Sequence, residues 1–214
     1  MLVLTEQFSV ANHFLAELRD KNTQKDSMRF RRNLERLGEI FAYEISKTMH
    51  YQNISIETPL GIKTTQQVAQ APVLLTIMRA GLPLHQGLLN FFDKSENAFI
   101  GAYRGKHDEK DAFEIEMDYI TSPDIHGKTL IICDSMLATG KSVEKAYHAM
   151  LRYGIPAKTH IVSAIASRRG VRYVQARMSE CRLWIGDVDE ELNSKSYIVP
   201  GLGDAGDLAF GGKV

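Results

Sequence analysis

The segment from Asp134 to Ser142 carries groups that could bind a phosphorylated sugar. The aliphatic residues 129–133 lead into Asp134, and the letters TGKS at 139–142 precede a helical pattern. This order predicts a strand, a turn and a helix start, where unpaired backbone N–H groups and the helix dipole attract an anion. A carboxylate at the end of the strand can accept hydrogen bonds from sugar hydroxyls.

Three interpretations of this segment remain open from its residues alone. The TGKS ending is similar to the P-loop of ATP-binding proteins, but that motif needs a glycine at the position of Ser135. An ordinary turn between a strand and a helix, as in many α/β proteins, also fits. The third interpretation is the loop with which type I phosphoribosyltransferases bind phosphoribosyl diphosphate (PRPP), which residues 134–142 closely resemble.

The composition is that of an ordinary globular protein. Of 214 residues, 44% are hydrophobic and 24% charged, and 26 basic residues balance 26 acidic ones, which argues against a nucleic-acid-coating protein. Cys133 and Cys181 show no metal-binding or disulfide spacing, which favours a reducing compartment. The sequence has neither a signal-like start nor an apolar run of membrane-spanning length. We expect a cytoplasmic protein with a single domain, 1–214, and neither membrane nor nucleic acid as partner.

Strand-like and helix-like patterns alternate along the sequence. Apolar runs predict strands at 54–60, 73–77, 97–105, 129–133, 159–166 and 181–188. Helical spacing and helix-breaking residues predict N-terminal helices within about 10–48, and further helices at 61–70, from 82, at 143–152 and at 167–180. This alternation predicts an α/β fold with a doubly wound, mostly parallel sheet flanked by helices.

Two arginines, Arg79 and Arg104, follow or end predicted strands. In an open parallel sheet, ligands bind beyond the carboxyl ends of the strands, so both arginines and Asp134 would converge on one crevice. A guanidinium fork matches two phosphate oxygens at once and is a natural clamp for a diphosphate. Either arginine could instead pair with a surface acid.

Two segments depart from the alternating pattern. Residues 105–127 join a charged run to a strand-like stretch, and we expect an extended arm or hairpin that leaves the main sheet as a lid, a surface hairpin or a dimer arm. The tail, about 189–214, is rich in glycine, which lets backbone groups approach a flat ligand closely. By itself, such a composition near a terminus predicts disorder.

The sequence resembles uracil phosphoribosyltransferases over nearly its whole length. Similar segments occur in the same order: LRDKNTQKDSMRFR, AYEI, ETPL, IMRAGL, GAYR, DSMLATGKS, DEELN and YIVPGLGDAGD. The last is the most specific, because other PRPP-using families share the loop at 134–142 but not this tail. The resemblance implies a small base-binding hood built from the tail. It also implies the conversion of uracil and PRPP to UMP and diphosphate, with Mg²⁺ held mainly by PRPP.

The resemblance also implies roles for individual residues. Arg79 and Arg104 would hold the diphosphate, and Asp204 would lie close to PRPP or its Mg²⁺. The rest of the PRPP site would be Asp134, Ser135, Met136, Leu137, Ala138, Thr139, Gly140, Lys141 and Ser142. Uracil would be lined by Ile198, Gly203, Asp204 and Ala205, through backbone groups that read its imide edge. The catalytic residues would then be Arg79, Arg104, Asp134 and Asp204.

Some positions differ from the usual family pattern. Ser135 replaces a proline, Lys141 replaces a glycine, and Gly105 follows Arg104 where an acid or amide is frequent. A side chain at Lys141 is expected to cost conformational freedom at a tight turn, while its charge would lie near the 5′-phosphate. Two other functions stay open: a sensor of nucleotides or PRPP without turnover, and a transferase for another base. The family habit implies a homo-oligomer, most simply a homodimer.

Overall fold

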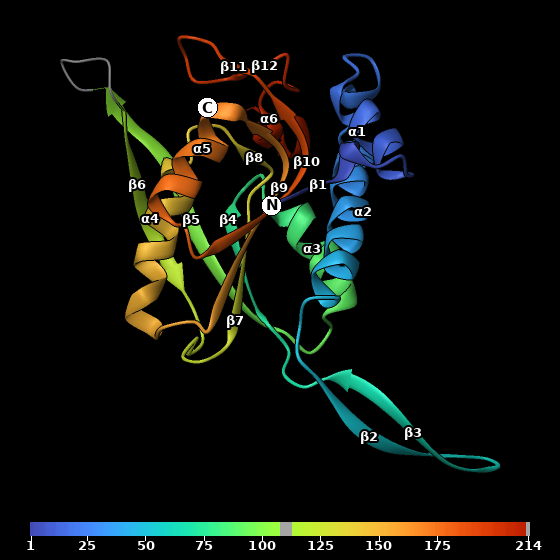
Figure 1. Cartoon of the computed structure of the whole chain (residues 1–214). Coiled ribbons are helices and arrows are strands. Elements are labelled where there is room, and N and C mark those ends of the chain that lie inside the picture. Colours follow the sequence, from blue (N-terminus) through green and yellow to red (C-terminus); the bar gives the residue numbers. More distant parts are fainter. Residues whose placement is uncertain (108–112, 213–214) are drawn as a thin grey trace.

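One large sheet organises the fold (Figure 1). The computed structural model describes residues 1–107 and 113–212, and the side chains at 102–107 and 113–116 lie outside this description. Within the described ranges the sheet comprises β1 (Leu2–Val3), β4 (Val73–Met78), β5 (Glu96–His107), β6 (Phe113–Thr121), β7 (Thr129–Cys133), β8 (Met136–Leu137), β9 (Lys158–Ser167) and β10 (Cys181–Asp189). The order is β1-β10-β9-β7-β4-β5-β6, with β8 paired to β9. All these pairs are parallel except β5 with β6, which confirms the predicted mostly parallel sheet.

Helices cover both faces of the sheet (Figure 1). One face packs against α1 (Ala11–Arg19), α2 (Ser27–Ser46), α3 (Leu82–Phe91) and α6 (Ala205–Phe210), and the other against α4 (Lys141–Met150) and α5 (Arg168–Arg177). Short 3-10 helices lie at η1 (Leu4–Glu6), η2 (Thr23–Lys25) and η3 (Leu151–Tyr153). Successive strand residues point to opposite faces, so Leu74 packs with the first group and Leu75 with the second. The sheet is therefore doubly wound, as predicted.

The longest helix, α2, shows why local sequence patterns predict most elements. It begins where the Asp26 side chain accepts a hydrogen bond from the Arg29 backbone N–H at 3.1 Å, a cap that contributes about 1 kcal/mol. Its apolar stripe is buried in the core: Phe30, Leu34, Leu37, Phe41 and Ile45. The stripe repeats at helical spacing, so one side of the helix packs and the other faces water.

The prediction of a helix at 61–70 is wrong. Residues Gly61–Val68 form β3, which pairs antiparallel with β2 (Tyr51–Thr58) in a hairpin that projects from the body of the protein (Figure 1). The short connection brings Gly61 opposite Thr58, and Gly61 has a φ of 151° that disfavours residues with side chains. The β-branched Thr64 and Thr65 favour a strand once such a partner is available.

The segment 105–127 contributes to a hairpin, as predicted, but it does not leave the main sheet. Strand β6 pairs with β5 from Thr121 opposite Phe99 to Phe113 opposite His107, and it is an edge strand of the sheet. The connecting residues 108–112 lie outside the described residues. Met117 and Ile120 pack against the core on the α4 side, so staying in the sheet buries them.

The glycine-rich tail is folded. After β10, the strands β11 (Glu191–Leu192) and β12 (Ile198–Val199) form a small hairpin, and α6 follows. Ile198, Leu202, Ala205 and Ala209 belong to the same buried cluster as α2, so the tail is anchored by apolar contacts. The disorder that its composition suggested is therefore not found in the described residues.

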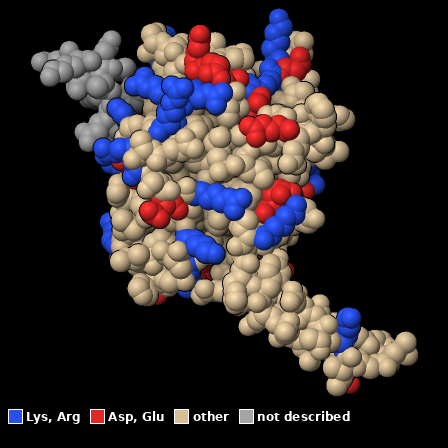
Figure 2. Space-filling model, in the orientation of Figure 1, with Lys and Arg blue, Asp and Glu red and all other residues tan. Residues whose placement is uncertain are grey.

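Charged groups of both signs are interspersed over the face of the molecule shown in Figure 2. Several form ion pairs on the helices, such as Arg32 Nη1 with Glu35 Oε1 and Arg177 Nε with Glu144 Oε1, each at 2.8 Å. The arginine of each pair is exposed to water, so these pairs contribute little to stability. Across the described ranges, the structure contains no helix with the length and apolar character needed to cross a lipid bilayer.

Candidate active site

Two predicted site residues follow neighbouring strands at the centre of the sheet. Strand β4 pairs with β5 on one side and β7 on the other, so the strand order reverses there. Thr76 of β4 lies opposite Cys133 of β7, and Arg79 and Asp134 are the first residues after these two strands. Open α/β sheets bind ligands in the crevice at this reversal, so the topology places both residues at the expected site.

The loop after β7 is held rigidly against β9. The Ser135 carbonyl oxygen accepts hydrogen bonds from the backbone N–H groups of Ala164 at 3.1 Å and Ile165 at 3.3 Å. Farther along, the Ser167 hydroxyl donates to the Ala138 carbonyl oxygen at 2.5 Å. Because these contacts are made by the protein itself, the loop is ordered for binding, which lowers the entropic cost of positioning a substrate.

The end of the loop requires a glycine at Gly140 but not at Lys141. Gly140 precedes α4 with a φ of 82°, and a Cβ there would lie 2.9 Å from Tyr173 Cδ1. Lys141 is the first residue of α4, is exposed, and is not among the positive-φ residues of the described ranges. The expected conformational cost of a side chain at Lys141 is therefore absent, because the left-handed position is Gly140.

The Asp134 carboxyl group has a pKa near neutral pH. Burial raises its pKa to about 7, although hydrogen bonds from the backbone N–H groups of Met136 and Ser135 act in the opposite direction. The residue remains partly exposed. Near neutral pH this group therefore changes charge, and donors such as sugar hydroxyls would favour its ionised form.

Arg79 joins the tail to the carboxyl end of β4. Its Nη2 atom lies 3.3 Å from Asp207 Oδ1 and 3.3 Å from the Gly211 carbonyl oxygen, in and just after α6. The turn that carries Arg79 also touches the end of β7, since a Cβ at Gly81 would lie 3.0 Å from the Cys133 carbonyl oxygen. The turn after β4, the end of β7 and the C-terminal segment thus meet.

The residues predicted to line a base lie on the tail, but not all of their side chains are free to do so. Ile198 and Ala205 are buried in the core, which leaves their backbone groups for a ligand. Gly203 is exposed with a φ of 94°. Asp204 caps α6, since its Oδ1 atom accepts hydrogen bonds from the N–H groups of Gly206 at 2.9 Å and Asp207 at 3.1 Å.

Arg104 lies within a strand and not at the end of one. It lies inside β5, opposite Ile115 and three residues before the strand ends at His107, so the prediction that the strand finishes at this arginine is wrong. Antiparallel pairing with β6 extends β5 beyond the point where the apolar run stops. The Arg104 side chain lies outside the described part of the structure.

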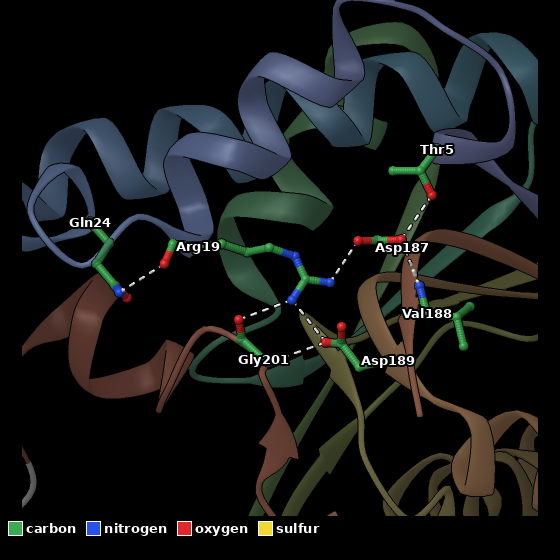
Figure 3. A network of polar contacts seen from close by, with 7 residues as sticks. All are labelled: Thr5, Arg19, Gln24, Asp187, Val188, Asp189 and Gly201. Carbon is green, nitrogen blue, oxygen red and sulfur yellow. Dashed lines mark hydrogen bonds and ion pairs between the residues drawn. The ribbon is translucent and has the colours of Figure 1, made fainter. Parts of the chain in front are cut away.

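Sequence reasoning missed the charged residues that hold the tail. Arg19 bonds Asp187, Asp189 and the Gly201 carbonyl oxygen (Figure 3), and Arg31 Nη1 donates to the Ala209 carbonyl oxygen at 2.6 Å. Asp187 and Asp189 are two residues apart at the end of β10, so their side chains are expected on the same face of the strand. Their arginine partner has no local signal, because it lies 168 and 170 positions away.

The doubly wound sheet, with an acid-led loop at its reversal point and a separate C-terminal hood, is the architecture of a type I phosphoribosyltransferase. The solved purine phosphoribosyltransferase from Pyrococcus horikoshii shares this fold at 12% identity, with a TM-score of 0.50 over 74% of this protein and 84% of that one. A family model described as uracil phosphoribosyltransferase matches residues 5–212. The chain belongs to the uracil phosphoribosyltransferase family and is a PRPP-dependent glycosyltransferase.

Individual relatives agree with this membership. The uracil phosphoribosyltransferase of Porphyromonas gingivalis is 50% identical over 212 residues, which cover 99% of this protein and 98% of the relative. That of Pyrococcus furiosus is 39% identical over 204 residues, 92% of this protein and 84% of the relative. The solved structure of the AQ2163 protein from Aquifex aeolicus is similar with a TM-score of 0.86 at 30% identity, over 97% of each protein.

Proposed function

We propose that the crevice beyond β4 and β7 is where this protein converts uracil and PRPP to UMP and diphosphate, a pyrimidine salvage reaction. The contact of Arg79 with Asp207 carries the proposal, because it joins the turn after β4 to the tail. The loop at 134–142 is common to PRPP-using proteins, whereas the tail resembles only uracil enzymes. A site that contains both would bind PRPP and select uracil.

PRPP would lie along the crevice from the start of α4 to Arg79. Backbone N–H groups from Gly140 to Ser142 would hold its 5′-phosphate, and Asp134 would accept hydrogen bonds from the ribose hydroxyls. Arg79, together with Arg104, would hold the diphosphate. As the bond from C1 to diphosphate breaks, positive charge grows on the ribose and negative charge on the leaving group, and a fixed guanidinium stabilises the latter. Uracil N1 then bonds to C1 and its proton is released to water, so no covalent nucleophile is needed.

Uracil would contact the tail mainly through backbone groups. The imide edge of uracil presents one N–H donor and two carbonyl acceptors, which complement backbone carbonyl and N–H groups. The backbone at Ile198, Gly203 and Ala205 would read this edge, since two of these side chains are buried and glycine has none. Asp204 would lie nearest to PRPP while capping α6.

Mg²⁺ would reach the site with PRPP. Among the described residues, no group of three His, Cys, Asp or Glu side chains could hold a metal ion. Mg²⁺ commonly binds through one or two carboxylates plus substrate phosphates, and Asp204 can supply one such ligand. The remaining ligands would be PRPP oxygens and water. When bound, Mg²⁺ neutralises charge that develops on the leaving diphosphate.

A base-panel assay tests this function. Purified protein with PRPP and Mg²⁺ should release diphosphate and form UMP with uracil, and should release none with adenine, guanine or hypoxanthine. A reaction without base is the control for PRPP hydrolysis. PRPP binding without UMP formation would favour a sensor, and product from one of the purines would favour a transferase for another base.

We also propose that the protein forms a homodimer through the hairpin β2–β3. The hairpin projects from the body (Figure 1) and carries exposed apolar side chains, including Leu60 at 100% and Ile62 at 80% exposure. Its only charged residues are Glu57 and Lys63, so it is mostly uncharged in Figure 2. A second copy could bury these side chains symmetrically.

Light scattering in solution tests the dimer. The wild-type protein should have twice the mass of one subunit, and Ile62→Glu should shift it toward the monomer because a buried charge disfavours the contact. Gln175→Glu, which adds the same charge at an exposed position on α5, is the matched control and should stay dimeric. A monomeric wild-type protein would refute the proposal.

The state of the two cysteines indicates the kind of cellular compartment that suits this protein. Cys133 is buried and Cys181 partly buried, and both are free thiols. Burial raises the pKa of the Cys133 thiol to about 12, so it stays protonated and unreactive. Free thiols suit a reducing environment, and we place the reaction in the cytoplasm.

A further inference from the structure

A partly buried charge network joins the end of α1 to the end of β10 (Figure 3). Arg19 Nη2 lies 2.7 Å from Asp187 Oδ2, and Arg19 Nη1 lies 2.8 Å from Asp189 Oδ2. The Arg19 and Asp189 side chains are only 20% and 9% exposed, so water screens this contact weakly. Asp187 is fixed in turn by the Thr5 hydroxyl, which donates to its Oδ1 at 2.8 Å. The planar fork of the guanidinium thus holds two carboxylates in one geometry.

The same network holds the backbone of one tail residue, Gly201, through both its N–H and its carbonyl oxygen. Arg19 Nη1 donates to the Gly201 carbonyl oxygen at 3.0 Å, and the Gly201 N–H donates to Asp189 Oδ2 at 3.2 Å. Gly201 has a φ of 59°, and a Cβ there would lie 2.1 Å from the Ile198 carbonyl oxygen. The tail therefore passes Arg19 in one conformation that only glycine permits.

Gly201 lies in the middle of the proposed base-binding residues. Ile198 precedes it by three positions, and residues 203–205 begin two positions after it. The Arg19 guanidinium contacts β10 and the tail, whereas the loop at 134–142 is held by β9 and α5. Arg19 is thus coupled to one half of the site.

We propose that Arg19 is a positioning residue for uracil. By fixing the Gly201 backbone against β10, Arg19 sets the position of the neighbouring backbone groups of the tail relative to the ribose. This inference rests on the proposed function and names a residue that acts through the tail without touching substrate. Loss of the guanidinium leaves Asp187 and Asp189 facing each other without a counter-charge, so the carboxylates and the tail must separate.

Steady-state kinetics of Arg19→Gln and Arg19→Lys test the proposal. We expect Arg19→Gln to raise KM for uracil about tenfold and to change KM for PRPP less than about twofold, because only the tail loses its anchor. Arg19→Lys keeps the charge but cannot fork over both carboxylates, so it should give an intermediate KM for uracil. Arg29→Gln is the matched control, since the Arg29 guanidinium pairs with Glu17 on α1 and should leave both KM values unchanged.

A purely structural role for Arg19 predicts a different result. In that case the melting temperature falls while KM for uracil stays unchanged, or both KM values rise together, and either outcome overturns the proposal. If Arg19→Gln does not fold, Arg19→Lys and Asp189→Asn decide the question by the same split between the two KM values. If the wild-type protein uses another base, the proposed function fails, and the split is measured with that base.

Discussion

Arg79→Gln is expected to lower kcat for UMP formation about 100- to 1,000-fold, because a preorganised cation at the leaving diphosphate is lost. Glutamine retains hydrogen-bonding capacity but carries no charge. The effect should fall on kcat more than on KM for uracil, since the charge on diphosphate grows as the bond to the ribose breaks. Single-turnover measurement of diphosphate release reports this step directly.

Arg79 also contacts the tail, so a control must separate the two roles. Asp207→Asn removes the charged partner of Arg79 at 3.3 Å and leaves the guanidinium and its contact to the Gly211 carbonyl oxygen in place. It should change kcat less than about threefold, because an exposed ion pair contributes little. Equal losses in both variants would mean that Arg79 serves only to hold α6, and the proposed diphosphate site would be wrong.

Asp134→Asn is expected to weaken PRPP binding about 10- to 100-fold at pH 8, because hydrogen bonds to a charged acceptor are stronger than those to an amide. The pKa of Asp134 in the free protein is about 7, so the carboxyl is largely neutral at pH 6 and ionised at pH 8. Wild-type affinity for PRPP should therefore rise with pH across this window. Calorimetric titration at both pH values measures the change.

Asp134→Asn also serves as the control for ionisation of the PRPP phosphates. Any pH dependence that Asp134→Asn retains belongs to the ligand, and the difference between the two profiles belongs to Asp134. A wild-type profile parallel to that of the variant would contradict the assignment of the carboxylate to the ribose.

The contribution of Asp134 to the free energy of unfolding should fall as the pH rises, whereas the affinity for PRPP should increase. The pKa of Asp134 is about 7 in the folded protein and lies above its ordinary value of 3.8. Between pH 3.8 and about pH 7, the carboxyl is therefore protonated in the folded protein and ionised in the unfolded protein. Stability from this group is therefore present at low pH and is lost as the pH rises from about 4 to about 7. Asp134→Asn removes the buried charge, and its melting temperature should exceed that of the wild type at pH 8 and approach it as the pH falls.

The elements predicted correctly are those whose signal is local. The apolar run of β7 and the helical stripe of α2 are each contained within a short stretch of sequence. The errors concern pairing: β3 becomes a strand because β2 faces it, and β6 stays in the sheet because β5 extends alongside it. A strand's partner is a property of the fold, so short polar segments give no reliable local signal for it.

The order of residue types within 134–142 also predicts what the loop can bind. An acid after a buried strand, followed by a glycine at a helix start, predicts an anion site without knowledge of the tertiary structure. The structure adds that the residue with a left-handed conformation is Gly140. The resemblance to a known family identified the tail as more than a flexible end. Composition by itself favoured disorder there.

The sequence by itself therefore determined the strand, loop and helix that carry Asp134, the doubly wound class of the fold and the identity of the candidate groups. Only the tertiary structure decided which side chains contact the C-terminal tail. Arg79 reaches Asp207 across 128 positions and Arg19 reaches Gly201 across 182. Such contacts form because the packed sheet and helices bring distant segments together, and no pattern within either segment encodes the partner.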